Sequence, residues 1–332
     1  MKAAIVGLSG PALTDDEAAT LRAHPPAGVI LFVRNIRDPA QLAGLVGALR
    51  HMLAPDAVLM VDQEGGRVAR LRPPHWRAHP PAAALGALFA ADAGRGLRAS
   101  FLSGALIGAE AAACGVDVVA APVLDRLVPG ADAIVGDRAF GADPRAIARL
   151  GRAFAEGLLA AGVQAVIKHL PGHGRARADS HVALPVVDGP EDEADADLLP
   201  FALNAGLPWA MTAHILYPAW DAALPATLSR AVVEGVIRGR IGFSGVLVSD
   251  DLAMGALNGA PADRAVAALA AGCDLALYCA GDLAPTAALL AACPRVGPET
   301  AARLRAARAM AARALVPLDV AALAAERESL LG

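Results

Sequence analysis

Short apolar runs bounded by glycine, proline or charged residues recur along the whole chain, and this repeat constrains the fold more than any other feature. Eight runs are expected to be strands, at residues 3–6, 29–32, 57–61, 116–120, 163–167, 209–213, 246–248 and 274–278. They are mostly apolar and do not alternate with polar residues, which is typical of strands in a parallel sheet whose faces are both buried. The repeat therefore favours an α/β fold.

Helix signals separate most of the runs. Asp38 and Asp143 each precede a proline, the pattern of an N-cap followed by proline at the first helical position. Ser229 is the expected N-cap of a helix ending near Gly239, and Gly162 is expected to end the helix before the fifth run. Eight such strand–helix units in 332 residues predict a closed (β/α)₈ barrel, with residues 1–332 as a single domain.

An open, doubly wound sheet is the competing architecture. Its dinucleotide-binding form needs Gly-x-Gly-x-x-Gly after the first strand, and Gly7-Leu8-Ser9-Gly10-Pro11 does not supply it. The chain also has no Gly-, Ser- or Pro-rich linker that would divide it into two parts. One barrel is the simpler interpretation.

Composition excludes several classes of function. Hydrophobic residues make up 56% of the chain, enough for a large core, and aromatic residues only 4%. The net charge is −4 without a block of like charges, so neither nucleic acid nor a membrane is an expected partner. The apolar run at residues 3–8 is too short for a signal peptide. We expect a cytoplasmic protein that is a monomer.

Polar residues follow several of the runs directly. Asp62 follows the third run, Lys168 and His169 the fifth, His214 the sixth, and Asp250 the seventh after Ser249. In a (β/α)₈ barrel the carboxyl ends of all strands meet at one face, where the active site lies. The sequence therefore predicts one site built from these residues.

The stretch from residue 168 to 181 carries the densest set of proton-transferring groups. It contains one lysine, three histidines and one aspartate around Pro171, Gly172 and Gly174, and we expect a loop beginning at Lys168. Asp179 and His181 are two residues apart, close enough for the carboxylate to orient the imidazole. This pair is a candidate general acid/base.

Two neighbouring carboxylates, Asp250 and Asp251, close the seventh run. A carboxylate at the rim of a barrel can act as a nucleophile, a base or a metal ligand. Side chains alternate along a strand, so only one of the two points into the barrel. The residues themselves do not decide which one, and Asp251 could instead cap the following helix.

Two glycine-bounded loops carry arginines. Residues 62–70 include Asp62, Arg67 and Arg70, and residues 136–141 include Arg138. Guanidinium groups can bind a polyhydroxylated or an anionic ligand, and a carboxylate can accept from vicinal hydroxyls, as in many sugar-binding sites. A salt bridge at the rim is the alternative interpretation.

A metal site is a weaker hypothesis. His169, His173, His181 and His214 with Asp250 could be ligands of a hydrolytic metal ion. However, no His-x-His pair follows the first run, and Lys168 would place a positive charge beside the cation. We expect neither a metal nor a cofactor.

Taken in chain order, these segments resemble the β-N-acetylhexosaminidases of glycoside hydrolase family 3. The similarity extends from about residue 29 to residue 278. It rests on the segments Gly28-Val29-Ile30-Leu31-Phe32 with Arg34-Asn35, Asp62-Gln63-Glu64-Gly65-Gly66-Arg67-Val68, Gly136-Asp137-Arg138-x-Phe140-Gly141, Lys168-His169-x-Pro171-Gly172-His173-Gly174 with Asp179-Ser180-His181, Pro225-Ala226-Thr227-Leu228-Ser229, and Ser249-Asp250-Asp251-Leu252-x-Met254.

The resemblance implies a role for each candidate residue. Asp250 would be the nucleophile that forms a covalent glycosyl-enzyme, and His181, oriented by Asp179, would be the general acid and then the base. The residues that would hold the hydroxyls and the N-acetyl group of the sugar are Asp62, Arg70, Arg138, Lys168 and His169. This pattern departs from the usual pair of carboxylates in retaining glycosidases, but a histidine suits proton transfer at neutral pH.

The resemblance also implies a substrate. The chain has no room after the barrel for the second α/β domain of many relatives, and is in this respect similar to cytoplasmic bacterial enzymes that recycle muropeptides. Such enzymes release N-acetylglucosamine from 1,6-anhydro-N-acetylmuramic acid. Three alternatives stay open at this point: a β-glucosidase, a β-N-acetylglucosaminide phosphorylase, and a sugar-binding barrel without turnover.

Overall fold

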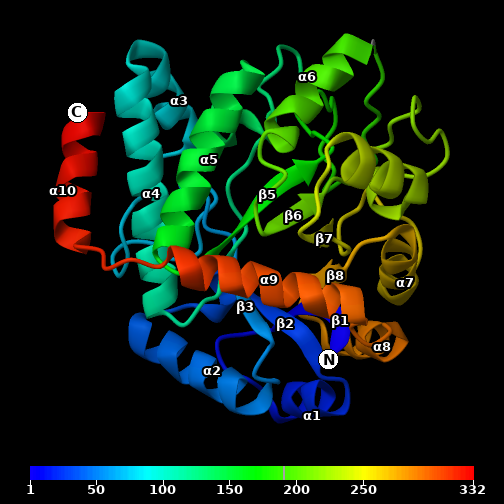
Figure 1. Ribbon diagram of the computed structural model, residues 1–332. Helices are drawn as coiled ribbons and strands as arrows, with labels where there is room; N and C mark the ends of the chain where they lie inside the picture. Colours follow the sequence, from blue (N-terminus) through cyan, green and yellow to red (C-terminus); the bar gives the residue numbers. More distant parts are fainter. Residues whose placement is uncertain (190) are drawn as a thin grey trace.

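A computed structural model describes residues 1–189 and 191–332, and in this part of the chain eight parallel strands close into a barrel (Figure 1). Strand β1 pairs with both β2 and β8, which closes the ring. The predicted (β/α)₈ fold is confirmed, and each predicted run overlaps one strand. The strands are β1 (Lys2–Gly7), β2 (Pro26–Leu31), β3 (Val58–Val61), β4 (Val118–Val119), β5 (Gln164–Leu170), β6 (Trp209–Thr212), β7 (Val246–Asp251) and β8 (Leu275–Tyr278).

Strand β5 is longer than predicted. The sequence predicted a loop from Lys168 onward, but β5 continues through Lys168 and His169 to Leu170, which pairs with Thr212 of β6. The prediction was wrong because it treated a charged residue as the end of a strand. Acidic side chains at the end of β3 neutralise Lys168 inside the barrel, so the strand can extend through it.

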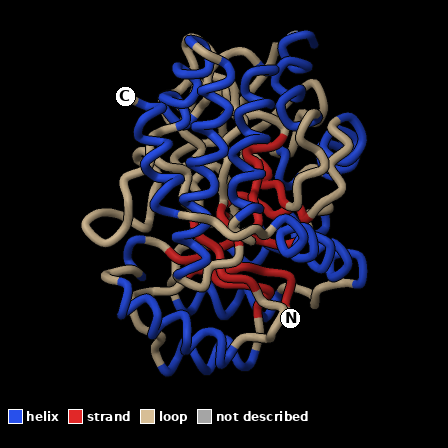
Figure 2. The backbone as a smooth tube through the Cα atoms, turned by 60° about the vertical axis from the view of Figure 1, so that its left-hand side comes forward, coloured by secondary structure: helices blue, strands red, loops and turns tan. Residues whose placement is uncertain are grey.

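Helices enclose the barrel on its outer side, as Figure 2 shows from a second direction. They are α1 (Asp15–Ala23), α2 (Pro39–Met52), α3 (Ala82–Ala91), α4 (Ala93–Ala113), α5 (Pro144–Ala160), α6 (Glu191–Ala202), the π-helix η4 (Ala231–Arg240), α7 (Pro261–Ala271), α8 (Leu283–Ala292), α9 (Pro298–Ala314) and α10 (Val320–Leu331). Short 3₁₀ turns are η1 (Val33–Asn35), η2 (Gly136–Arg138) and η3 (Ala226–Leu228).

The residues predicted to begin and end helices lie at the ends of helices in the structure. The carboxylate of Asp38 accepts from the N–H of Gln41 at 2.9 Å, and that of Asp143 caps α5 in the same way. Gly162 follows the end of α5 with φ at +79°, a conformation that glycine adopts without steric cost. The Ser229 hydroxyl accepts from the N–H of Val232 at 3.1 Å at the start of η4.

Alternate residues of each strand pack on opposite sides of the barrel wall. On β7, Val246 and Val248 belong to the cluster inside the barrel, whereas Leu247 packs toward the helices. Trp209 fills the interior, fully buried, and its indole N–H donates to Gln164 at 2.8 Å. Because the interior is packed, the open end at the C-terminal side of the strands is the place for a binding site.

The last two helices pack on different parts of the barrel. Helix α9 lies across its N-terminal end, where Ala307 joins the interior cluster, and α10 lies beside α4 (Figure 1). Arg98 of α4 makes two hydrogen bonds of 2.7 Å to Glu326 of α10. Across residues 1–189 and 191–332, no helix is long and apolar enough to cross a membrane.

Candidate active site

A pocket of about 250 Å³ opens at the C-terminal ends of the strands. This volume is below the roughly 300–1,000 Å³ typical of pockets for drug-sized ligands, so the pocket suits a small ligand such as one sugar unit. The predicted site residues that line it are Asp62, Arg70, Arg138, Lys168, His169, His181 and Asp250. Asp179 stands outside the lining and contacts it through His181.

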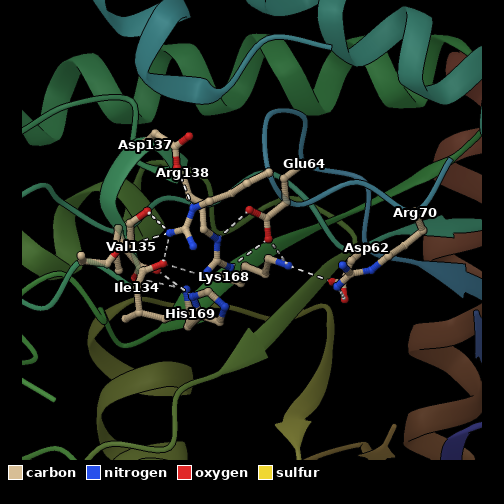
Figure 3. Close-up of polar contacts among 12 residues, drawn as sticks. Asp62, Glu64, Arg70, Ile134, Val135, Asp137, Arg138, Lys168 and His169 are labelled. Carbon is tan, nitrogen blue, oxygen red and sulfur yellow. Dashed lines mark hydrogen bonds and ion pairs between the residues drawn. The ribbon is translucent and has the colours of Figure 1, made fainter. Parts of the chain in front are cut away.

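Lys168 forms the centre of a charged cluster on one wall of the pocket (Figure 3). Its Nζ lies 3.0 Å from Oδ1 of Asp62 and 2.7 Å from Oε1 of Glu64. Arg70 donates to the other oxygen of Asp62 at 3.0 Å, and Arg138 binds Glu64 through two hydrogen bonds of 2.8 and 2.9 Å. Three cations and two carboxylates thus hold one another in fixed orientations.

The cluster keeps its carboxylates ionised. Burial raises the pKa of Glu64, but Lys168 and Arg138 outweigh burial and hold that pKa at about 2. Burial likewise opposes ionisation of Asp62, and the charges of Lys168 and Arg70 more than compensate, so its pKa is lowered. The pKa of Lys168 is raised, because both carboxylates outweigh the effect of burial. At neutral pH the wall presents charged donors and acceptors of the kind that bind hydroxyl groups.

A buried aspartate orients the next histidine on β5. Asp125 is 1% exposed, and its Oδ2 lies 2.7 Å from Nδ1 of His169. Its Oδ1 accepts from the backbone N–H groups of His169 and His173 at 3.2 and 2.7 Å. Because an ionised carboxylate only accepts, Nδ1 of His169 carries the proton, and Nε2 is left for the pocket.

The two carboxylates at the end of β7 have different surroundings. Oδ1 of Asp251 accepts from the N–H groups of Ala253 and Cys279, both at 2.9 Å, so this side chain holds the backbone after β7. Burial raises the pKa of Asp250, but the electrostatic interactions with His169 and His214 outweigh burial and lower it. Asp250 is therefore ionised in the pocket.

Asp179 and His181 make the hydrogen bond that their spacing predicts. Nδ1 of His181 lies 2.7 Å from Oδ1 of Asp179, which also accepts from the backbone N–H of His181 at 2.8 Å. Burial raises the pKa of Asp179, but these hydrogen bonds and the charge interactions with His181 and His173 together outweigh burial, so the pKa is lowered. The imidazole is 58% exposed and faces the pocket.

The remaining histidines of the metal hypothesis have protein partners. Nδ1 of His214 lies 2.8 Å from the Thr227 hydroxyl and its Nε2 lies 3.0 Å from the Asp251 carbonyl oxygen. Nε2 of His173 lies 3.1 Å from the Ser180 hydroxyl. Within the part of the chain that the structure describes, no three His, Cys, Asp or Glu side chains are grouped so that they could hold a metal ion.

Glu64 and Asp125 were not predicted as site residues, although both make ion pairs or hydrogen bonds with residues that were. Glu64 is two residues after Asp62, and the alternation of side chains could have suggested that both face the pocket. Asp125 comes five residues after the end of the fourth apolar run, whereas Asp62 follows the third run directly. The shared feature is a carboxylate in the segment that follows a barrel strand.

Comparisons with known proteins place the chain in a family. Residues 3–311 match the model of the glycosyl hydrolase family 3 N terminal domain. The β-hexosaminidase of Thiobacillus denitrificans is 44% identical over 280 residues, which are 83% of this chain and 77% of the relative. The β-hexosaminidase of Aromatoleum aromaticum is 40% identical over 312 residues, 92% of this chain and 86% of the relative.

Solved structures show the same likeness. The crystal structure of NagZ from Neisseria gonorrhoeae in complex with N-trifluoroacetyl-D-glucosamine superposes with a TM-score of 0.87 at 31% identity. The match covers 100% of this chain and 98% of that protein.

Proposed function

Because the chain belongs to glycosyl hydrolase family 3, we propose that it is a retaining exo-β-N-acetylglucosaminidase with Asp250 as nucleophile. The proposal rests on the observation that three features lie together in one pocket. These are an ionised carboxylate on β7, a histidine oriented by Asp179, and the charged wall around Lys168. The names of the β-hexosaminidase relatives support the coarser assignment of a β-N-acetylhexosaminidase.

In the first step, a carboxylate oxygen of Asp250 attacks the anomeric carbon of the sugar. The bond from this carbon to the leaving oxygen breaks, and the leaving oxygen takes a proton from His181. The product is a sugar ester of Asp250 and a free alcohol. The lowered pKa of Asp250 keeps the attacking group ionised.

In the second step, His181 acts as base. It takes a proton from water, the water oxygen attacks the anomeric carbon, and the ester bond to Asp250 breaks. Two displacements at one carbon retain its configuration. Asp179 holds the imidazole in one orientation and stabilises its protonated form in both steps.

The sugar would be held by five residues of the pocket, Asp62, Arg70, Arg138, Lys168 and His169. Asp62 and Glu64 accept hydrogen bonds, and Lys168 and the arginines donate them, so hydroxyl groups find both kinds of partner. His169 would present Nε2 to the ligand, because Nδ1 is engaged by Asp125. Buried, mutually fixed polar groups of this kind reject a sugar that leaves them unpaired.

The natural substrate would be a muropeptide in which N-acetylglucosamine is linked to 1,6-anhydro-N-acetylmuramic acid. The enzyme would cleave this linkage and release N-acetylglucosamine during cell-wall recycling. The likeness to NagZ in complex with N-trifluoroacetyl-D-glucosamine supports an N-acylated sugar in the pocket. A cytoplasmic monomer that needs no cofactor would fit this role.

Initial rates on 4-nitrophenyl N-acetyl-β-glucosaminide and 4-nitrophenyl β-glucoside test the proposal. We expect a strong preference for the N-acetylated sugar, and equal or reversed rates would support the β-glucosidase instead. Assays with and without phosphate separate hydrolysis from phosphorolysis, since only a phosphorylase would form a sugar 1-phosphate. Failure to trap a 5-fluoro sugar on Asp250 would argue against the nucleophile.

A further inference from the structure

We propose that residues 252–256, called here the docking segment, hold the loop of His181 in place, and that Gly255 is a positioning residue for proton transfer. The inference rests on the acid/base role proposed for His181. It adds a backbone contact that supports His181 and that involves none of the charged groups of the pocket.

Two consecutive hydrogen bonds join the His181 loop to the docking segment. The N–H of Gly255 donates to the carbonyl oxygen of His181 at 3.0 Å, and the N–H of Ala256 donates to that of Ser180 at 3.2 Å. Because the segment follows β7 directly, the strand of the proposed nucleophile also supports the loop of the proposed acid/base.

Gly255 allows this close approach because it has no side chain. A Cβ at this position would lie 2.8 Å from the carbonyl oxygen of His181 and 2.9 Å from that of Val182. Gly255 does not have a positive φ, so the lack of space, and not the backbone conformation, favours glycine. Backbone oxygens have no rotamer to change, so an added methyl group has to displace the loop.

The docking segment is itself held firmly. The Asp251 carboxylate accepts from the N–H of Ala253 at 2.9 Å, and Arg264 of α7 donates to the carbonyl oxygens of Leu252 and Met254 at 2.6 and 3.2 Å. A displacement caused at Gly255 will therefore move the His181 loop more than the segment.

A second contact fixes the loop on its inner side. Ser180 and His173 are both buried, with 2% and 4% of their surface exposed, and the Ser180 hydroxyl lies 3.1 Å from Nε2 of His173. The imidazole of His181 is itself largely exposed. Its position is thus set by the loop backbone and by Asp179, and not by packing of the ring.

The leaving group provides the test. A 2,4-dinitrophenolate leaves without protonation, whereas a 4-methoxyphenolate needs a proton from the acid, and kcat/KM reports on this first step. For Gly255→Ala we expect kcat/KM to fall about tenfold on the 4-methoxyphenyl N-acetyl-β-glucosaminide and to change little on the 2,4-dinitrophenyl one. The inhibition constant of N-acetylglucosamine should stay unchanged, since the charged wall is untouched.

Matched variants complete the design. Gly206→Ala makes the same change where no described atom lies within 4 Å of the new Cβ, and it should leave both rates unchanged. Ser180→Ala removes the contact to His173. It should also lower kcat/KM more on the 4-methoxyphenyl substrate than on the 2,4-dinitrophenyl one, by a smaller factor than Gly255→Ala. This variant provides the test if Gly255→Ala does not fold.

The outcomes separate the inference from the proposed function. If His181→Ala shows the leaving-group pattern and neither Gly255→Ala nor Ser180→Ala does, the docking role is refuted and the acid role stands. Equal losses on both substrates would also refute it, since they indicate general damage. If His181→Ala lacks the pattern, the acid role fails and the inference fails with it.

Discussion

At the scale of single residues, the adjacent carboxylates Asp250 and Asp251 differ in pKa because different charges surround them. Burial is the largest influence on both and raises both values. Near Asp250, the interactions with His169 and His214 reverse the effect, whereas for Asp251 burial prevails and its pKa is raised. The position of a carboxylate relative to residues distant in sequence thus decides the direction in which its pKa shifts.

Asp179→Ala tests the orientation of His181. The variant loses the acceptor for Nδ1, so we expect kcat to fall roughly tenfold or more while binding of N-acetylglucosamine is retained. Steady-state rates on 4-nitrophenyl N-acetyl-β-glucosaminide and the inhibition constant of the free sugar measure the two effects. Full kcat in this variant would show that the pair does not act together.

Asp125→Asn tests the tautomer of His169. The amide N–H₂ of asparagine would face the N–H of Nδ1, so we expect the proton to move to Nε2 and N-acetylglucosamine to bind roughly tenfold more weakly. Histidine ¹⁵N NMR reports the tautomer, and inhibition kinetics report the binding. An unchanged tautomer together with unchanged binding would contradict the assigned role.

At the scale of elements, α4 and α5 pack closely because glycines face the contact. A Cβ at Gly157 would lie 2.2 Å from the carbonyl oxygen of Phe101, and one at Gly104 would lie 2.0 Å from that of Phe154. In both cases the neighbour is backbone. The close packing of α4 on α5 thus depends on small residues, which apolar periodicity alone does not reveal.

Gly157→Ala should therefore lower the free energy of unfolding by about 1–3 kcal/mol, because the helices have to separate. Gly47→Ala in α2 is the matched control, since its new Cβ meets no described atom within 4 Å. That change should stabilise the protein by about 0.5–1 kcal/mol through helix propensity. Urea denaturation measures both, and equal effects of the two substitutions would contradict the close packing.

At the scale of the whole molecule, the ion cluster at the pocket makes stability depend on pH. The pKa of Glu64 is about 2 in the folded protein, against an ordinary value of 4.5 for a glutamate. A lowered pKa contributes stability that is complete above the unfolded value and is lost as pH falls toward the folded value. For Glu64 the loss occurs between pH 4.5 and about 2.

We expect this carboxylate to account for about 2 kcal/mol of the unfolding free energy lost between pH 7 and pH 3. Glu64→Gln should be less stable at pH 7, since Lys168 and Arg138 lose a counter-charge, but should lose less on acidification. Urea denaturation of both proteins at the two pH values gives the comparison. Parallel losses would show that Glu64 is not the responsible group.

The assignment of residues 1–332 to one domain stays a prediction. Helix α10 packs on α4, and Arg327 of α10 lies 2.8 Å from Nδ1 of the buried His79, so the end of the chain is tied to the barrel. We expect one cooperative transition, with fluorescence and circular dichroism changing together. Two separate transitions would indicate independent domains.

The sequence by itself determined the strand–helix alternation, the helix caps at Asp38 and Asp143, and the gathering of polar residues at the carboxyl ends of the strands. Each depends on residues close together in the chain, where local hydrogen bonds and burial periodicity act. Only the tertiary structure decided that β5 extends through Lys168, that the pKa of Asp250 is lowered while that of Asp251 is raised, and that Glu64 and Asp125 hold site residues. These outcomes depend on charges and hydrogen bonds between residues distant in sequence, which meet only when the barrel closes.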